Sequence, residues 1–214
     1  MAASEPTGLM AFWAEIDGAY LDRFREWHNC EHMPERVSIP GFVGGRRYFA
    51  VGDSKGVLMM YETVEAAVLA SPPYMERLNA PTPWTKESLP HFGNPSRNIY
   101  SLVAGEGASD FVAAPYMISV RFNGEVDAEI VVALRRAGGV GRVRLYAIDE
   151  AISGIETSER AIYGGGPGQQ QWLLLIEAAS PSLDAAREAA AGWRDVFVDS
   201  FAVEYVLAAP GGGG

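Results

Sequence analysis

Residues 18 to 48 read GAYLDRFREWHNCEHMPERVSIPGFVGGRRY, and this stretch decides how the chain divides into helices and strands. Its first part spaces aromatic residues three to four positions apart, as one face of a helix requires: Tyr20, Phe24 and Trp27. Pro34 closes that pattern, and the apolar and aromatic run after it is typical of a strand. The stretch therefore predicts a helix over 18–35 that leads into a strand over 41–51.

The segments around this stretch complete a unit of four strands and two helices. An apolar run over 9–16 predicts a strand before the helix. After the strand over 41–51, a turn rich in glycine and polar residues leads to another strand over 57–62, which predicts a hairpin. A second helix, interrupted by two prolines, is expected over 64–78, and a last strand over 97–104. The order βαββαβ is that of a ferredoxin-like unit.

The second half of the chain repeats the same order. Its expected strands cover 116–122, 142–148, 171–178 and 201–207, and its expected helices cover 127–137 and 183–198. A ferredoxin-like unit carries both helices on one face of an antiparallel sheet, so the other face must be covered. We therefore predict an α+β fold in which two tandem ferredoxin-like units pack sheet against sheet as an intrachain α+β barrel. Further pairing into a homodimer is left open.

The two units differ in their chemistry. All three histidines and the single cysteine precede residue 105. We therefore assign the candidate site to a first unit over 1–104, joined by a linker over 105–115 to a second unit over 116–208 that serves as a scaffold copy. The glycine-rich end over 209–214 is expected to be a flexible tail. Another glycine-rich run, over 164–168, lacks the lysine of a phosphate loop and is expected to connect two strands of a hairpin.

Composition favours a small-molecule partner. The 214 residues are 48% hydrophobic and 21% charged, which is typical of a soluble globular chain. A net charge of −10, with lysine only at Lys55 and Lys86, argues against a nucleic-acid partner. No apolar run has the length of a membrane helix and no signal peptide is recognisable, so we expect a cytoplasmic protein with no membrane partner. A single cysteine excludes an internal disulfide and a multi-cysteine zinc site.

His28 and His32 lie four residues apart and therefore share one face of the expected helix. Imidazole titrates near neutral pH, so either ring could act as a general acid or base. The same spacing could hold a divalent metal, but Asn29 stands where the zincin motif has glutamate, and no third ligand is near. No metal is therefore predicted. The structural alternative is that a ring caps the helix or bonds a backbone carbonyl.

A resemblance to a known group adds to these patterns. The run WHNCEHMPERVSIPGFVGGRRY, with AFWAEID before it and LMMYE after it, resembles the EthD-like group of dimeric α+β barrel proteins. It covers residues 9–104, whereas the second half matches by element order alone. The resemblance implies ferredoxin-like units that pair through their sheets and hold ligands between sheet and helices. It also implies a catalytic-pocket role for His32 and, after it, for His28. The group includes isomerases, polyketide cyclases, decarboxylases, cofactor-free monooxygenases and haem-degrading enzymes.

Further candidate residues lie on the strands beside the helix. Asp17, at the end of the first expected strand, could orient a catalytic histidine or cap the helix that follows. Arg46 and Tyr48 share one side of a strand and could bind a carboxylate or phenolate, with an ordinary salt bridge as the alternative. Tyr61, on the paired strand, could donate a hydrogen bond to a substrate oxygen or lie in the core.

Aromatic residues complete the candidate substrate-binding set. Trp84 and His91 fall in a proline-broken segment over 81–95, which is expected to roof the pocket or to form a packed surface loop. Trp13 is expected in the pocket wall. Cys30, between the two histidines, is expected to be packed rather than to act as a nucleophile.

Together these features predict a small-molecule enzyme of lyase or isomerase type that needs no organic cofactor. We expect His32, with His28 as its partner, to move a proton on an apolar, aromatic or polyketide-like compound during isomerisation, cyclisation, lyase or decarboxylation chemistry. Such catalysis predicts a rate that changes with an apparent pKa of about 5.5 to 7.5. One alternative is a monooxygenase of the same fold, either cofactor-free or with haem held by His91 or His28. Another is a ligand-binding or stress-response module without catalysis.

Overall fold

The computed structural model describes residues 5–53, 55–107, 114–182 and 184–210. Its strands are β1 (Gly8–Ile16), β2 (Phe42–Ala50), β3 (Val57–Thr63), β4 (Phe92–Gly107), β5 (Tyr116–Asn123), β6 (Val140–Ile148), β7 (Trp172–Ala178) and β8 (Arg194–Ala208). Its α-helices are α1 (Leu21–Trp27), α2 (Met33–Val37), α3 (Pro72–Asn79), α4 (Pro83–Ser88), α5 (Ile130–Arg135), α6 (Glu150–Ser153), α7 (Ser158–Tyr163) and α8 (Asp184–Ala190). Four short helical segments complete the set: η1 (Gly18–Tyr20), η2 (His28–His32), η3 (Ala66–Ala70) and η4 (Leu89–His91).

The strands form one closed barrel in the order β1-β3-β2-β8-β5-β7-β6-β4. Within it, the first unit contributes the sheet β4-β1-β3-β2 and the second contributes β8-β5-β7-β6, each the strand order of a ferredoxin-like unit. The two sheets join edge to edge, where β2 pairs with β8 and β4 pairs with β6, both antiparallel. The predicted intrachain α+β barrel of two tandem units is therefore confirmed.

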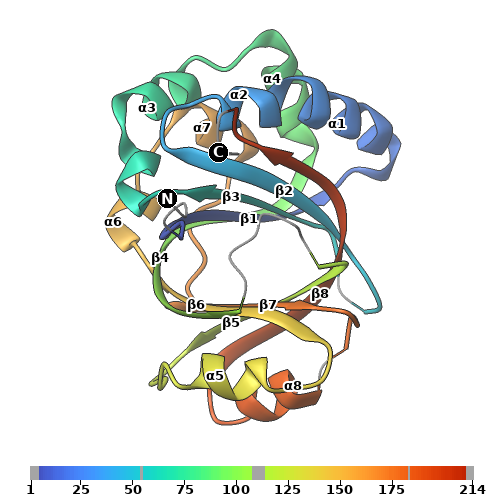
Figure 1. Ribbon diagram of the computed structural model, residues 1–214. Helices are drawn as coiled ribbons and strands as arrows, with labels where there is room; N and C mark the ends of the chain where they lie inside the picture. The colour runs from blue at the N-terminus through green and yellow to red at the C-terminus, as the bar shows by residue number, and fades with distance from the viewer. Residues whose placement is uncertain (1–4, 54, 108–113, 183, 211–214) are drawn as a thin grey trace.

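Helices cover the outside of the barrel on two opposite sides (Figure 1). The layer over the first unit's sheet contains α1, α2, α3, α4 and α7, and the layer over the second unit's sheet contains α5 and α8. Side chains alternate along each strand, so Leu9 and Ala11 of β1 point into the barrel while Met10 and Phe12 point toward the first helical layer. The protein thus has three apolar cores: one inside the barrel and one beneath each helical layer.

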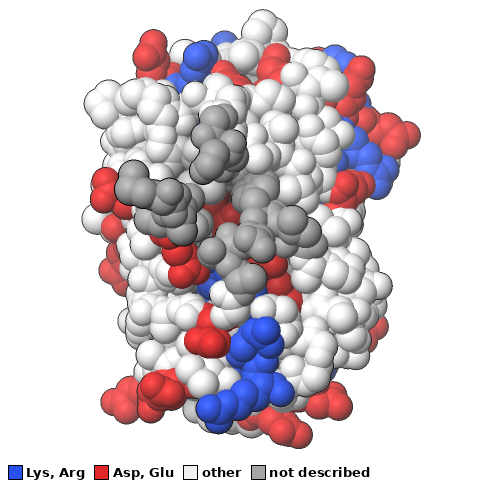
Figure 2. Space-filling model, viewed as in Figure 1, with Lys and Arg blue, Asp and Glu red and all other residues white. Residues whose placement is uncertain are grey.

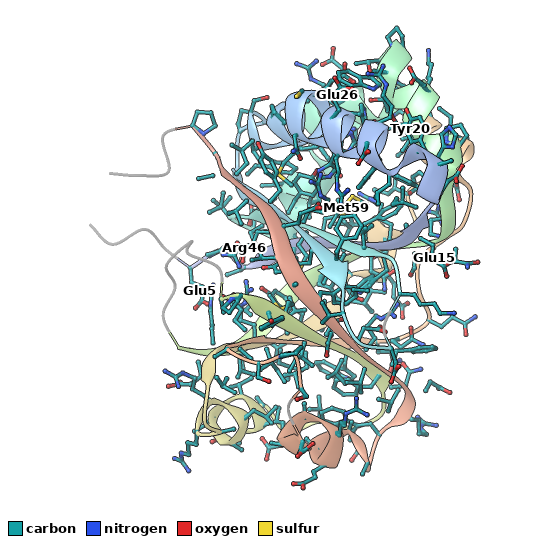
Figure 3. All side chains as sticks on the ribbon, turned by 90° about the vertical axis from the view of Figure 1, so that its right-hand side faces the viewer. Glu5, Glu15, Tyr20, Glu26, Arg46 and Met59 are labelled. Carbon is teal, nitrogen blue, oxygen red and sulfur yellow. The ribbon has the colours of Figure 1, made fainter. Side chains whose placement is uncertain are left out.

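A buried ion cluster lies inside the barrel beside the apolar side chains. The Arg46 guanidinium lies 3.4 Å from the Glu62 carboxylate and 3.1 Å from that of Glu177. Arg144 pairs with the same two carboxylates and lies 2.9 Å from Glu177. Each arginine comes from the second strand of its unit and each glutamate from the third, so the cluster follows the internal repeat. Figure 3 places Arg46 between the two sheets.

Several element boundaries differ from the sequence predictions. The helix expected over 183–198 forms but ends early, because α8 ends at Ala190 and β8 begins at Arg194 to pair with both β5 and β2. This strand closes the barrel, and its long-range pairing overrides the local helical spacing. The segment 81–95 is not a loop, since it contains α4, η4 and the start of β4. The hairpin expected between β6 and β7 carries α6 and α7 instead of a simple connection.

Acidic side chains are spread over both helical layers in Figure 2, as the net charge of −10 leads one to expect. Among the helices of the described ranges, none has the length and apolar character needed to span a membrane.

Candidate functional site

The helix that carries both histidines changes its winding at the site. After α1, residues His28–His32 form a single π-helical turn, in which the Met33 N–H donates to the His28 carbonyl oxygen, five residues back. The next residue, Pro34, has no N–H to donate, yet the helix continues through it as α2 to Val37. The wider turn therefore carries the chain past the proline, which sequence spacing predicted as the end of the helix. Such turns often occur at functional sites.

His28 is fully buried behind the cavity wall and both its ring nitrogens have partners. Arg47 Nη1 lies 3.0 Å from His28 Nδ1, and because arginine only donates, Nδ1 must accept. The proton then resides on Nε2, which donates to Tyr61 Oη at 3.3 Å. Burial, with the nearby charges of Arg47 and Arg36, lowers the pKa of His28 well below its ordinary value. His28 is therefore a neutral ring held in one tautomer.

His32 lines a cavity between the first unit's sheet and its helices. Its Nδ1 is buried and has no hydrogen-bond partner among the described residues, and its ring packs 4.4 Å from the Trp27 ring. Burial, followed by the charge of Arg36 and the neighbouring His28, lowers the pKa of His32 well below its ordinary value. At neutral pH the ring is uncharged and able to accept a proton.

The cavity is narrow and mostly apolar. Its volume, counted out to its mouth, is about 470 Å³. Its apolar wall includes Met10, Phe12 and Met59, and Figure 3 shows Met59 below the helical layer. Flexible methionine side chains can adjust to a ligand. Several aromatic side chains also line the cavity, and they offer ring faces and edges against which an aromatic ligand can pack.

Two arginines bring positive charge into this cavity. The buried Arg36 forms an ion pair with Glu159 and lies 3.2 Å from the Glu35 carboxylate. Arg97 Nη2 donates to Tyr74 Oη at 3.2 Å. Burial raises the pKa of Glu159, and the Arg36 guanidinium opposes that rise. The cavity thus combines a neutral imidazole with groups suited to bind negatively charged oxygen.

Part of the cavity wall comes from the second unit. Thr157, Glu159 and Tyr163 line the cavity, and they belong to the segment between β6 and β7 that crosses onto the first helical layer as α7 (Figure 1). Asn79 Oδ1 accepts a hydrogen bond from the Ser158 N–H at 3.0 Å and so joins α3 to α7. Burial raises the pKa of Tyr163 to about 12, so its phenol stays protonated. The second unit therefore helps to build the cavity.

The candidate strand residues fall on two sides of the first sheet. Tyr61 lines the cavity together with His32. Arg46 and Tyr48 point the other way, into the barrel, where Arg46 belongs to the buried ion cluster. Trp13 also lies in the barrel core, with the Arg121 guanidinium 4.5 Å from its ring. These three residues are separated from the cavity by the sheet itself.

Asp17 and His91 meet at the surface rather than at the cavity histidines. Asp17 Oδ1 accepts a hydrogen bond from the Ala19 N–H at 3.0 Å and so caps η1, and Oδ2 lies 3.3 Å from His91 Nδ1. The His91 ring stacks on Tyr20 at 3.8 Å. Trp84 lies beneath the Arg23 guanidinium, 4.3 Å away, and does not line the cavity.

Cysteine and metal chemistry receive no further support from the geometry. Cys30 is exposed, not packed as expected. Across the ranges that the structure describes, no group of three or more histidine, cysteine, aspartate or glutamate side chains is placed to hold a metal ion.

Comparison with known proteins identifies the fold. The chain is similar to an anthrone oxidase-like protein, with a TM-score of 0.59 and 11% identity over 97% of this chain and 95% of that chain. It is similar to a protein provisionally named a monooxygenase from Fusobacterium nucleatum subsp. nucleatum, with a TM-score of 0.54 and 10% identity over 96% of each chain. It is also similar to a protein provisionally named a chlorite dismutase, with a TM-score of 0.50 and 12% identity over 94% of this chain and 95% of that chain.

No protein-family model matches the sequence, and no curated protein matches it either. At such low identity, the structural likeness shows the fold alone. The protein has the dimeric α+β barrel fold. In this chain both ferredoxin-like units of the barrel are covalently joined.

Proposed function

We propose that the protein is an enzyme that removes a proton from an enolisable aromatic compound, with His32 as the general base. The observation that carries this proposal is the buried Nδ1 of His32, which has no hydrogen-bond partner among the described residues and belongs to a ring in the cavity wall. A buried polar atom without a partner is costly, and a bound substrate would supply the missing contact.

In the proposed step, His32 takes a proton from a carbon that is conjugated with a carbonyl group, either directly next to it or, as in anthrone, across the ring from it. The electron pair of the broken C–H bond moves to the carbonyl oxygen and forms an enolate. The positive charge of Arg36 and Arg97 would stabilise that oxygen in a largely dry cavity. His28, bonded to Arg47 and Tyr61, would hold the cavity wall rather than exchange protons. Isomerases, cyclases, lyases and decarboxylases all use enolates of this kind.

A cofactor-free monooxygenase is the second candidate, favoured by the fold likeness to an anthrone oxidase-like protein. It would begin with the same deprotonation. Molecular oxygen would then oxidise the anion, and for anthrone the balance is one anthrone plus one O₂ giving one anthraquinone plus one water. The protein would supply the base and the oxyanion site in both cases.

The histidines do not fit the haem alternative. His28 has partners at both ring nitrogens, and His91 lies at the surface, stacked on Tyr20 and bonded to Asp17. His32 shares its cavity of about 470 Å³ with the side chains of Arg36, Arg97 and Glu159, and the second unit contains no histidine. The proposed reaction therefore uses no haem.

Anthrone is a suitable probe for both candidates. Without oxygen in D₂O, we expect the protein to accelerate exchange of the anthrone methylene protons, followed by NMR. In air, exchange without extra oxygen uptake supports the first candidate, and uptake of one O₂ per anthraquinone supports the second. Anthrone that binds but neither exchanges nor consumes oxygen faster than in buffer would instead indicate a binding module. A Soret band of one haem per chain on titration would contradict the haem-free proposal.

A further inference from the structure

Arg97 is the one cavity arginine that has no acidic partner in the described part of the chain. It projects from β4, opposite Phe12 of β1 in the sheet register, into the cavity wall. Its Nη2 donates to the Tyr74 hydroxyl at 3.2 Å, and within the described ranges no carboxylate oxygen lies within 4.0 Å of its guanidinium. Arg36, the other cavity arginine, pairs with Glu159 and Glu35.

The contrast with the rest of the interior makes this residue unusual. Among the described residues, the buried arginines each form an ion pair with a glutamate, whereas Arg97 is half-buried and forms none; the paired arginines are Arg36, Arg46, Arg47, Arg142, Arg144 and Arg160. Arginine stays charged at all ordinary pH values, so the half-buried Arg97 cannot avoid the cost of partial desolvation by losing its proton. A ligand that brings an anionic oxygen would offset that cost.

The charges that line the cavity also limit the charge of the ligand. Glu159 balances the charge of Arg36, and His32 is uncharged at neutral pH. The Glu35 carboxylate beside Arg36 is balanced by Arg77, 3.5 Å away. Arg97 therefore leaves the cavity with a net charge of about +1. A ligand with a single negative charge would balance it, whereas a second negative charge would face the Glu159 carboxylate.

We propose that Arg97 is the anchor for the anionic oxygen of the substrate, and that the substrate is a flat aromatic monoanion, a carboxylate or a phenolate. Tyr74, which already accepts from Arg97, supplies a hydroxyl proton to the same oxygen. The choice of a substrate, as opposed to another ligand, rests on the proposed function of His32; the anion site itself does not. Arg97 is a binding residue, and His32 remains the group that moves the proton. The imidazolium formed on His32 then offsets the second negative charge that proton removal creates on the substrate.

The test compares benzoate with its neutral isostere benzamide by calorimetry at pH 7.5. We expect the wild-type protein to bind benzoate at least tenfold more tightly than benzamide. Arg97→Gln should lose at least tenfold in benzoate affinity and leave benzamide unchanged, and Arg97→Lys should retain part of the preference. Arg23→Gln, which removes an exposed arginine of α1 outside the cavity wall, is the matched control and should bind like the wild type.

Glu159 provides an independent variant that keeps Arg97. Glu159→Gln preserves the size of the side chain but frees the charge of Arg36, so the cavity should then accept a dianion. We expect the affinity for phthalate, relative to benzoate, to rise at least tenfold in this variant. An unchanged phthalate-to-benzoate ratio would contradict the proposed limit of one negative charge.

The anion site is overturned if benzoate does not bind the wild-type protein, or if it binds no more tightly than benzamide. This outcome is measured on the wild-type protein alone, so it does not depend on whether a variant folds. The result is also separable from the role of His32. His32→Ala should keep the preference for benzoate even where it abolishes proton exchange. A protein that prefers benzoate but never catalyses exchange would keep the anion site and reject the proposed function.

Discussion

His28 and His32 are one turn apart, but their surroundings give them different chemistry. Arg47 and Tyr61 occupy both nitrogens of His28, whereas Nδ1 of His32 has no hydrogen-bond partner among the described residues and its ring lines the cavity. The spacing of the two residues in the sequence identifies the helix face, and it cannot reveal which ring is already bonded. That distinction depends on Arg47, which reaches His28 from a strand.

The pH dependence of the reaction should reflect the lowered pKa of His32. A general base works in its unprotonated form, so activity is retained until the pH falls to the pKa of the folded protein. Because burial and Arg36 lower that pKa well below the ordinary 6.5, the rate of anthrone exchange should stay level from pH 8 to about pH 6 and fall only in more acidic solution. This result would place the apparent pKa of the reaction at or below the lower end of the range of about 5.5 to 7.5 expected from sequence.

The measurement is an initial rate across pH 4.5 to 8, with the uncatalysed rate subtracted and folding checked by circular dichroism at each pH. A midpoint at or above 6.5 would mean that His32 is not desolvated as the structure indicates.

Other cavity residues show the limit of reasoning from sequence. Tyr61 and His32 were candidates, and both line the cavity. Arg36, Arg97 and Glu159 were missed, and Glu159 lies more than 120 residues from His32 in the sequence. In the sequence, the one signal that could have indicated a cavity cation was Arg97, a single arginine beside an apolar strand. No local pattern marks Glu159, because α7 reaches the first unit only when the barrel closes.

Among the elements, β1 lies directly against the backbone at the start of η3, and Gly8 is the residue at this contact. A Cβ atom on Gly8 would lie 2.3 Å from the Glu65 carbonyl carbon and 2.5 Å from the Ala66 nitrogen, both of them backbone atoms. We therefore expect Gly8→Ala to lower the free energy of unfolding by about 1–3 kcal/mol, since the backbone must shift. Gly18→Ala, whose Cβ would meet nothing within 4 Å, is the control in urea denaturation. Equal midpoints for the two variants would contradict this close approach.

The elements predicted best from sequence are those with strong local periodicity, such as β1, β2 and β3. The helix expected over 183–198 was predicted too long, because its second half belongs to β8, which is defined by partners on two distant strands, β5 and β2. Local spacing carries no information about those pairings. The histidine helix, expected to end at residue 35, runs on to Val37, because a π-helical turn carries the chain past Pro34.

At the scale of the whole molecule, the ion cluster inside the barrel links the two units. Arg144 of the second unit pairs with Glu62 of the first as well as with Glu177 of its own sheet. Arg144→Met would leave two buried carboxylates with fewer partners, so we expect it to lower the free energy of unfolding by about 3–5 kcal/mol. Arg23→Met removes an exposed pair with Glu87 and should cost no more than about 1 kcal/mol. Similar unfolding midpoints in urea for the two variants would show that the cluster does not hold the units together.

The barrel was predictable from sequence because each half repeats the βαββαβ order and must cover one sheet face. The contribution of the second unit to the cavity was not predicted, since the sequence analysis treated that unit as a scaffold. The boundaries assigned to the two units and their linker remain predictions, and the linker expected over 105–115 lies partly outside the described residues. The tail over 211–214 also lies outside them.

The most direct test of the proposed function compares His32→Ala with His28→Ala in anaerobic exchange of the anthrone protons. A general base contributes about 10²–10⁴ in rate, so His32→Ala should lose at least ~100-fold while circular dichroism shows an intact fold. His28→Ala should lose less, because His28 has partners at both ring nitrogens and lies behind the cavity wall. Near-normal exchange by His32→Ala, with the loss appearing in His28→Ala instead, would contradict the assignment of His32 as the base.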